Sequence, residues 1–315
     1  MMNKNLTIAI AKKVVSDLAV LLIILVLVIA VTGVPMDFGV SYHDGETFIS
    51  LTVSDAIQSI KNQFRLVLTG EAFKVEIKSE AVMEILKVAL GRSAFVLAVG
   101  TVLAVLIGVI KGIVDSRKTH RAGTFKLLQS LMPLSLPDIL IIALVQLGAL
   151  YFYKNEMPFL GLGVIHFIGD ETFLQAIYPI ISISILPAAV ISRTVAVVIE
   201  DGLSKPYVLA ARGKGCSMYQ IIKTHLSKSI AYGVISVLPT VMGIMFSSLV
   251  IVEMFFYYRG IGYHLIYFYT TTLVPKYEAG IAFTVFILAL SIIYYLIFTL
   301  LSVAKLMILP RMKTY

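Results

Sequence analysis

Tryptophan is absent from this chain of 315 residues, and cysteine occurs only once, at Cys216. A single cysteine excludes an intrachain disulfide and any metal site built from several thiolates. Charged residues are also scarce: they make up 14% of the chain, whereas a soluble domain of this size carries about 25%. This scarcity argues against a soluble globular protein.

The sequence also lacks the motifs of several chemistries. Its five histidines do not cluster at the spacing of zinc ligands, and no Gly-x-Ser-x-Gly elbow of a serine hydrolase occurs. Gly213-Lys214-Gly215 has neither the preceding strand nor the glycine spacing of a phosphate-binding loop. We therefore expect no enzyme, no metal site and no cofactor in this chain.

Long apolar runs take up most of the sequence, of which 59% is hydrophobic. A run of about 18 residues with few charges is long enough to cross a bilayer as a helix. Six such runs are present, at residues 14–34, 88–114, 127–152, 173–199, 230–252 and 279–305. The sequence therefore predicts an all-α membrane protein with six transmembrane helices.

The net charge is +8, and the basic and acidic residues lie in different loops of the chain. Lysine and arginine gather before the first run, between the second and third, between the fourth and fifth, and after the last, whereas most acids lie in the opposite loops. Basic residues mark the cytoplasmic side of short loops. We therefore predict cytoplasmic termini, a multi-pass membrane protein with a lipid bilayer as its surroundings, and no nucleic-acid partner.

Five parts follow from this arrangement. They are a cytoplasmic N-terminus (1–13), the first span (14–34), an extracytoplasmic connection (35–87), a core of five spans (88–305) and a cytoplasmic C-terminus (306–315). The basic start lacks a convincing signal-peptidase site, so we expect the first span to be a retained signal anchor. In the connection, the spacing of Ser54, Ile57, Ile60 and Phe64 predicts a helix within a small cap.

The cytoplasmic loop 200–229 has the signals of a short helix. Ser204 is a good N-cap, and Pro206 suits the first turn of the helix that follows. The helix runs through Arg212, and Gly213 and Gly215 are expected to end it, since glycine accepts the left-handed conformation of a C-cap.

A second helix then leads into the fifth span, because Ser217 and Gln220 form a capping-box pattern. Ala210 and Ala211 leave the first helix with a thin face that fits a groove on a partner protein, and the neighbouring Lys214 is suited to acidic groups around it. The alternative is an ordinary basic interfacial helix held by lipid headgroups.

The segment 207–215, Tyr-Val-Leu-Ala-Ala-Arg-Gly-Lys-Gly, followed by His225-Leu226, resembles the EAA loop of binding-protein-dependent ABC importer permeases. It is most similar to the first permease subunit of the oligopeptide, dipeptide and nickel importers. The segment 252–256 and the later Gly260-Ile261-Gly262 resemble that branch's Val-Glu-x-x-Phe and Gly-Leu-Gly runs. Pro137 and Arg193 also fall where the family often has these residue types.

The sequence departs from the family pattern in several places. Leu209 stands where the EAA consensus has glutamate, although this branch often lacks the glutamate too. Ser229 replaces a common asparagine, Tyr232-Gly233 stand where a proline is frequent, and Arg259 replaces the usual proline before Gly260.

The resemblance implies the permease fold of a type I ABC importer in the bacterial plasma (inner) membrane, with the loop helix as the coupling helix. The residues it assigns to ATPase coupling are Tyr207, Leu209, Ala210, Ala211, Arg212, Lys214 and Gly215. It implies a second permease subunit, two cytoplasmic ABC ATPases that bind ATP and Mg, and an extracytoplasmic substrate-binding protein. Short peptides are the expected substrate, with nickel or a metal chelate as the alternative. A secondary transporter driven by an ion gradient is the rival from another class.

Two acids are candidates for the pathway or its gate. Asp138 follows Pro137 in the third predicted span, where a charge is costly and is by default a functional-site hypothesis. The alternative is a carboxylate that binds backbone donors near a proline kink. Glu253 ends the fifth span, either as support for a gate or as a simple acid at the interface. Arg193, near the cytoplasmic end of the fourth span, is expected to snorkel.

Overall fold

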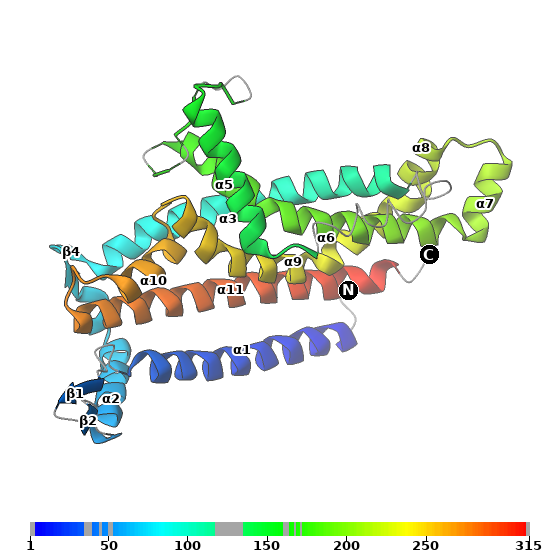
Figure 1. The fold of residues 1–315 in the computed structure, drawn as a ribbon. Helices are drawn as coiled ribbons and strands as arrows, with labels where there is room; N and C mark the ends of the chain where they lie inside the picture. Colours follow the sequence, from blue (N-terminus) through cyan, green and yellow to red (C-terminus); the bar gives the residue numbers. More distant parts are fainter. Residues whose placement is uncertain are drawn as a thin grey trace. The chain divides into compact units, whose positions relative to one another are not determined.

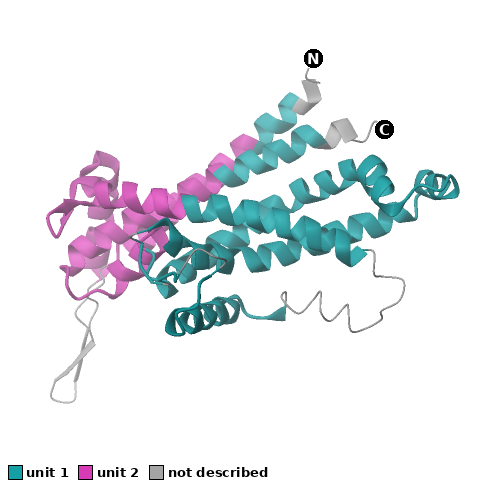
Figure 2. Cartoon of the chain, turned by 90° about the horizontal axis from the view of Figure 1, so that it is seen from above, with its two compact units in different colours: residues 1–13, 95–258, 297–315 teal, residues 14–94, 259–296 magenta. Residues whose placement is uncertain are grey.

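The computed structural model describes residues 4–34, 40–43, 46–49, 53–116, 135–159, 164–166, 168–170 and 172–312. The chain divides into two compact units, which are described separately (Figure 2). Unit 1 consists of Met1–Lys13, Phe95–Tyr258 and Ile297–Tyr315, and unit 2 consists of Val14–Ala94 and Arg259–Leu296.

Helices account for most of the described residues, as the long apolar runs predict (Figure 1). The α-helices are α1 (Lys4–Thr32), α2 (Val53–Thr69), α3 (Val82–Ser116), α5 (Asp138–Lys154), α6 (Ile177–Leu203), α7 (Pro206–Gly213), α8 (Met218–Ile221), α9 (Ser227–Phe255), α10 (Ile261–Thr270) and α11 (Lys276–Met312). Shorter helical elements are η1 (Glu71–Lys74), η2 (Phe173–Ala176) and the π-helical η3 (Ile222–Leu226).

Among the described residues, five helical segments are long and apolar enough to cross a membrane. They are Thr7–Thr32, Val82–Ser116, Phe173–Leu203, Met218–Phe255 and Lys276–Ile308. They correspond to the first, second, fourth, fifth and sixth predicted spans. Of the third predicted span, 127–152, the structure describes α5, which has 17 residues, while 127–134 lies outside the described residues. The third span thus stays a prediction.

The connection between the first two spans contains two small antiparallel hairpins in addition to helix. Strands β1 (Val40–His43) and β2 (Glu46–Ile49) pair with Val40 opposite Ile49. Strands β3 (Glu76–Ile77) and β4 (Glu80–Ala81) pair around a turn in which Lys78 and Ser79 have φ of 50° and 69°. Two consecutive left-handed residues are typical of a type I′ turn. Helix α2 confirms the helical spacing read from the sequence.

The turn between β3 and β4 lies against α10 within unit 2. The Lys78 ammonium lies 5.8 Å from the centre of the Tyr267 ring, within the range of a cation–π contact. Burial alone would raise the pKa of the Tyr267 phenol, but the hydrogen bonds with Lys78 and Thr271 and the Lys78 charge hold that pKa below its usual value. This pair ties the start of α3 to the segment that follows α9.

In unit 1, glycines let α3 pack closely against α6. A Cβ added at Gly108 would lie 2.7 Å from the Ile191 Cβ, and one added at Gly112 would lie 2.7 Å from the Val195 Cβ. Small residues are the usual means by which membrane helices approach closely. Gly233 plays the same part between α9 and α6, since its Cβ would lie 3.0 Å from Val198 Cγ2. Helix α6 is thereby packed between α3 and α9.

Candidate functional site

The loop between α6 and α9 forms a helical hairpin at one end of unit 1 (Figure 1). Its first residues differ from the prediction. Ser204 is the C-cap of α6 and donates its hydroxyl to the Asp201 carbonyl at 2.7 Å, so the prediction that Ser204 caps the next helix was wrong. The reason is that α6 extends to Leu203, beyond the predicted end of the span. Lys205 takes the N-cap position instead, and Pro206 opens α7 as predicted.

Helix α7 has an inner and an outer face. Val208 and Ala211, three residues apart, are buried and hold the helix to the rest of unit 1. Tyr207, Leu209 and Ala210 are exposed, and the Leu209 side chain is 53% accessible. The sequence predicted that Ala210 and Ala211 form one thin face, but the two residues lie on different faces of α7. Ala210 faces outward and Ala211 faces the protein.

The end of α7 is a Schellman turn. The Cys216 amide donates to the Ala211 carbonyl at 3.1 Å, and the Gly215 amide donates to the Arg212 carbonyl at 2.9 Å. This pair of hydrogen bonds requires a left-handed residue at the centre of the turn, and Gly215 supplies it with φ +83°. Of the two glycines expected to end the helix, only Gly215 has the left-handed conformation; Gly213 is the last residue of α7.

The second half of the hairpin leads directly into α9. Ser217 and Gln220 form the predicted capping box: the Ser217 amide donates to Gln220 Oε1 at 2.8 Å, and the Gln220 amide donates to Ser217 Oγ at 3.3 Å. Helix α8 then continues into η3 and α9 without a break. The sequence contains no indication of η3, since nothing in the apolar pattern distinguishes a π-helical turn from an α-helical one.

Leu226, at the end of η3, fixes the hairpin against α6. Its side chain is fully buried, and a Cβ added at Gly202 would lie 2.5 Å from Leu226 Cδ2. The hairpin is therefore held at its base by this contact and along α7 by Val208 and Ala211. What remains accessible is the outer face of α7 with the basic side chains Arg212 and Lys214, which are both exposed.

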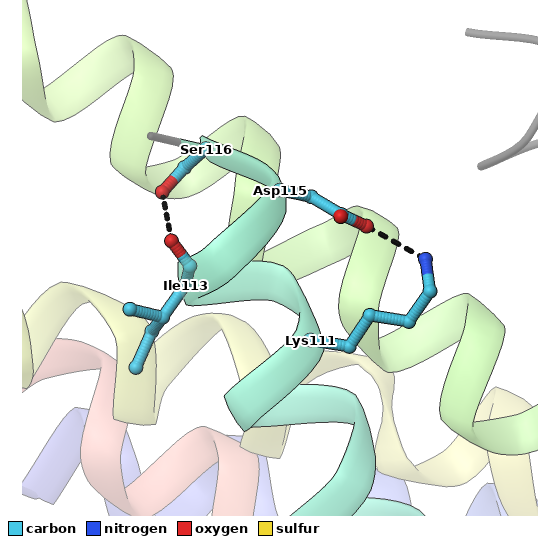
Figure 3. A network of polar contacts seen from close by, with 4 residues as sticks. All are labelled: Lys111, Ile113, Asp115 and Ser116. Atoms are coloured by element: carbon cyan, nitrogen blue, oxygen red, sulfur yellow. Dashed lines mark hydrogen bonds and ion pairs between the residues drawn. The ribbon is translucent and has the colours of Figure 1, made fainter. Parts of the chain in front are cut away.

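Figure 3 shows the last turn of α3, which leads toward the basic connection between the second and third predicted spans. The Lys111 ammonium lies 2.6 Å from the Asp115 carboxylate, and the Ser116 hydroxyl donates to the Ile113 carbonyl at 2.8 Å. A partly exposed pair of this kind contributes at most about 1 kcal/mol to stability. Its consequence is electrostatic, because Asp115 neutralises Lys111 and this end of α3 is therefore less basic than its lysine suggests.

Comparison with known families decides the class of the protein. Residues 104–305 match the family described as binding-protein-dependent transport system inner membrane component. This match covers α5, the hairpin and the candidate spans from α6 to α11.

The chain belongs to this family.

The permease is also similar to the dipeptide transport system permease protein DppB of Lactococcus lactis subsp. cremoris (strain MG1363). The two are 33% identical over 174 residues, which is 55% of this chain. The matched segment covers 52%, about half, of the length of that relative. The permease is thus a multi-pass component of the inner membrane, as the apolar spans predict.

The first of the two predicted pathway acids, Asp138, is the first residue of α5 and is half-buried. Pro137 precedes the helix in an extended conformation, with φ −57° and ψ 137°. The expected proline kink inside a helix was therefore wrong at this position, because α5 begins after the proline. The Asp138 carboxylate accepts a hydrogen bond from the hydroxyl of Ser248 on α9. This partner is a side chain of another helix and not the local backbone.

Glu253, the second acid, is fully buried near the end of α9. Burial of this kind does not fit a simple acid at the lipid interface. Two contacts gather around the same end of α9: Gln146 of α5 donates to the Phe255 carbonyl at 2.7 Å, and the Gly169 amide donates to the Phe256 carbonyl at 3.1 Å. The end of α9 is therefore tied to α5 and to the segment that precedes α6.

Helix α9 connects these acids to the hairpin. Ser248, the partner of Asp138, lies 21 residues after Ser227, which corresponds to about 32 Å along an α-helix. Arg193 lies on α6 and is half-buried, and its expected snorkelling stays a prediction. Among the described residues, no group of three or more His, Cys, Asp or Glu side chains is placed to hold a metal ion.

Proposed function

We propose that this permease forms half of the translocation pathway of an ATP-driven importer of short peptides, with α7 as its coupling helix. The observation that carries the proposal is the two-sided character of α7. One face is fixed to unit 1 by Val208 and Ala211, whereas Tyr207, Leu209 and Ala210 face outward. A short helix held in this way transmits a push on its outer face to the helices that hold it.

The chemistry of the outer face fits a protein partner better than lipid headgroups. An apolar tip formed by Leu209 and Ala210 is flanked by the cations Arg212 and Lys214, which suits a groove with an apolar floor and an acidic rim. The partner we propose is a cytoplasmic ABC ATPase, two copies of which would bind ATP and Mg. A second permease chain would complete the pathway, and an extracytoplasmic binding protein would deliver the substrate.

Motion of the hairpin would reach the pathway through α8, η3 and α9. Leu226 couples the start of α9 to the end of α6 at Gly202, and α9 carries Ser248 and Glu253 at its other end. A rotation of the hairpin would therefore change the position of the Ser248 hydroxyl relative to Asp138. In this proposal the termini are cytoplasmic, and the pair Asp138–Ser248 lines the pathway or its gate.

Leu209→Arg tests the coupling surface. We expect the variant to reduce co-purification of the ATPase by at least about tenfold, since a charge at the centre of an apolar contact removes a dominant part of the binding energy. The measurement is the amount of ATPase recovered with tagged permease from detergent extracts of cells that express the permease together with the proposed ATPase subunits. Thermal stability of the permease itself should change little, because Leu209 is exposed.

Ser229→Arg is the matched control, because Ser229 is also exposed and belongs to the adjoining α9. It adds the same charge outside α7 and should leave ATPase recovery unchanged. Equal recovery with wild-type, Leu209→Arg and Ser229→Arg permease would show that α7 is not the docking element.

Asp138→Asn tests the pathway. Asparagine keeps an oxygen that accepts the Ser248 hydrogen bond but removes the charge, so we expect uptake of a peptide with a free amino group to fall about tenfold, equivalent to roughly 1.4 kcal/mol. Uptake is measured in proteoliposomes that contain the complete importer. Ser248→Ala, which keeps the charge and removes the hydroxyl, should have a smaller effect. If Asp138→Asn assembles an intact complex and takes up peptide normally, the hypothesis that the Asp138 charge acts in the pathway is wrong.

The same proteoliposomes separate the classes of transporter. Uptake of a labelled dipeptide that requires ATP on the ATPase side of the membrane, and that survives an ionophore, supports the proposal. Uptake that follows an imposed ion gradient without ATP would instead favour a secondary transporter. If nickel or a nickel chelate competes for uptake and peptides do not, the transported substrate is nickel or a metal chelate and not a peptide. The similarity to a dipeptide permease is what favours peptides.

A further inference from the structure

Helix α2 is amphipathic, but its apolar side does not coincide with its buried side. With 3.6 residues per turn, Val53, Ile57, Ile60, Phe64 and Leu68 lie along one stripe of the helix. The buried positions lie on the neighbouring stripe and include the polar Gln63. On the apolar stripe, Val53 is 76%, Ile57 49% and Leu68 81% exposed. Ile60 and Phe64 are half-buried, so within the described residues it is the part of the stripe with Val53, Ile57 and Leu68 that needs another apolar surrounding.

Polar contacts fix α2 at the ends of two candidate spans. The Gln63 amide donates to Thr284 of α11 at 2.7 Å, and the Thr284 hydroxyl donates to that of Thr32 at 2.9 Å. The Asn62 amide donates to the Tyr277 hydroxyl at 2.9 Å. Thr32 is the last residue of α1, and Tyr277 is the second residue of α11. The helix therefore lies at the end of α1 and beside the first turns of α11.

The close approach of α1 and α2 sets their relative direction. A Cβ added at Gly33 would lie 3.0 Å from the Ile60 Cα, so the backbones meet with no side chain between them. Figure 1 shows α2 crossing the end of α1 and not continuing along it. A helix that crosses the end of a membrane span at the boundary runs close to the plane of the membrane surface.

We propose that α2 is an interfacial helix: Val53, Ile57 and Leu68 insert into the boundary between headgroups and acyl chains, and Lys61 and Arg65 bind the phosphates of anionic lipids. Lys61 and Arg65 are exposed and lie along the edge of the apolar stripe, beside Ile57 and Leu68. Basic side chains at the edge of an apolar helical face are typical of helices that lie in the membrane surface. In the proposed orientation, this is the outer leaflet.

Two observations favour lipid over a protein partner. The last turns of α1 expose Leu27 and Val31, so α1 and α2 both present exposed apolar side chains near the place where their backbones meet at Gly33 and Ile60. Lys61 and Arg65 have long apolar stems that let their charges reach the headgroup phosphates while the helix stays at the boundary. The proposal depends on the membrane spans alone, and a failure of the coupling or substrate assignments would leave it unaffected.

The absence of tryptophan from the chain makes a direct test possible. Ile57→Trp places one fluorophore on the apolar stripe, and Gln58→Trp, at the next residue, places one on the exposed polar side. Each full-length variant is reconstituted in nanodiscs of phosphatidylcholine and phosphatidylglycerol, with or without bromine at shallow acyl positions. We expect bromine to quench at least about half of the Ile57→Trp emission, as for a side chain buried about 5–10 Å into the boundary, and to quench Gln58→Trp weakly.

Equal quenching of the two variants, or none at Ile57→Trp, would overturn the proposal. Val53→Trp, one turn earlier on the same stripe, repeats the measurement if Ile57→Trp perturbs the fold. A third outcome identifies the rival: if lipid bromine leaves Ile57→Trp unquenched but added substrate-binding protein shifts its emission, the stripe is a protein-docking surface and the proposal is wrong. The charged edge is tested by adding Lys61→Gln and Arg65→Gln to the Ile57→Trp variant. Phosphatidylglycerol should increase the quenching of Ile57→Trp when both basic residues are present, and it should have no effect when both are replaced.

Discussion

Gly215→Val is expected to lower ATP-driven uptake by at least about tenfold while the permease still folds and inserts. Gly215 has φ +83°, a region that costs an L-residue roughly 1–2 kcal/mol and a β-branched residue more. The cheapest response of the chain is to change this backbone angle and to give up the hydrogen bonds of Gly215 and Cys216 with Arg212 and Ala211. The outer face of α7 would then point in a different direction.

The control for this experiment lies two residues away. Gly213 ends α7 with ordinary helical geometry, and a Cβ there meets no atom of the described residues within 4 Å. Gly213→Val therefore adds the same side chain without strain and should retain most of the uptake. ATPase recovery and uptake are measured on both variants. Wild-type uptake by Gly215→Val would show that coupling does not depend on the direction set by this turn.

Gly108→Leu is expected to prevent the α3–α6 contact and to cause loss of folded permease. A Cβ at this position would already lie 2.7 Å from the Ile191 Cβ and 2.8 Å from the Ala188 carbonyl oxygen. Because one of these atoms belongs to the backbone, relief requires the helices to separate. Overpacking of this kind costs about 1–3 kcal/mol or more. The measurement is the yield of monodisperse protein and its thermal midpoint in detergent.

Gly91→Leu makes the same change on the same helix at an exposed position, where a Cβ meets no described atom within 4 Å. We expect this variant to keep the wild-type midpoint or to exceed it slightly, since leucine favours a helix over glycine by up to about 1 kcal/mol. If the two leucine variants were equally stable, close packing of α3 on α6 would not be required for the fold.

Local signals account for what the sequence predicted well. Hydropathy located the five described spans, and the spacing of Ile57, Ile60 and Phe64 located α2, because both patterns depend on neighbours along one helix. The capping box of Ser217 and Gln220 was confirmed for the same reason. Family membership rested on the residues of the hairpin and of the α9 end, and the match over residues 104–305 confirmed it.

What the sequence could not supply depends on packing between distant segments. Serine is a common N-cap residue, but α6 extends to Leu203 and Ser204 is therefore its C-cap. Ala210 and Ala211 are equivalent by composition, and only the contact with unit 1 places Ala211 inside. The hydrogen bond between Thr284 and Thr32 joins residues 252 positions apart, and no local pattern indicates it. The surroundings of Asp138 likewise depend on α9, which contributes its Ser248 partner, and the burial of Glu253 depends on the segments packed around the end of α9.

The π-helical turn η3 determines how the number of residues in this region affects the direction of the hairpin. A π-helical turn accommodates one residue more than an α-helical turn, and each residue of an α-helix advances the direction of the chain by about 100°. Removing one residue between Ile222 and Leu226 would therefore restore a regular α-helical turn and leave the direction of α7 nearly unchanged, because the widened turn already accommodates the extra residue. Removing one residue from the α-helical start of α9 would instead turn α7 by about 100°. A sequence comparison would record a gap of one position in either case, whereas only the second deletion would aim the hairpin at a different place.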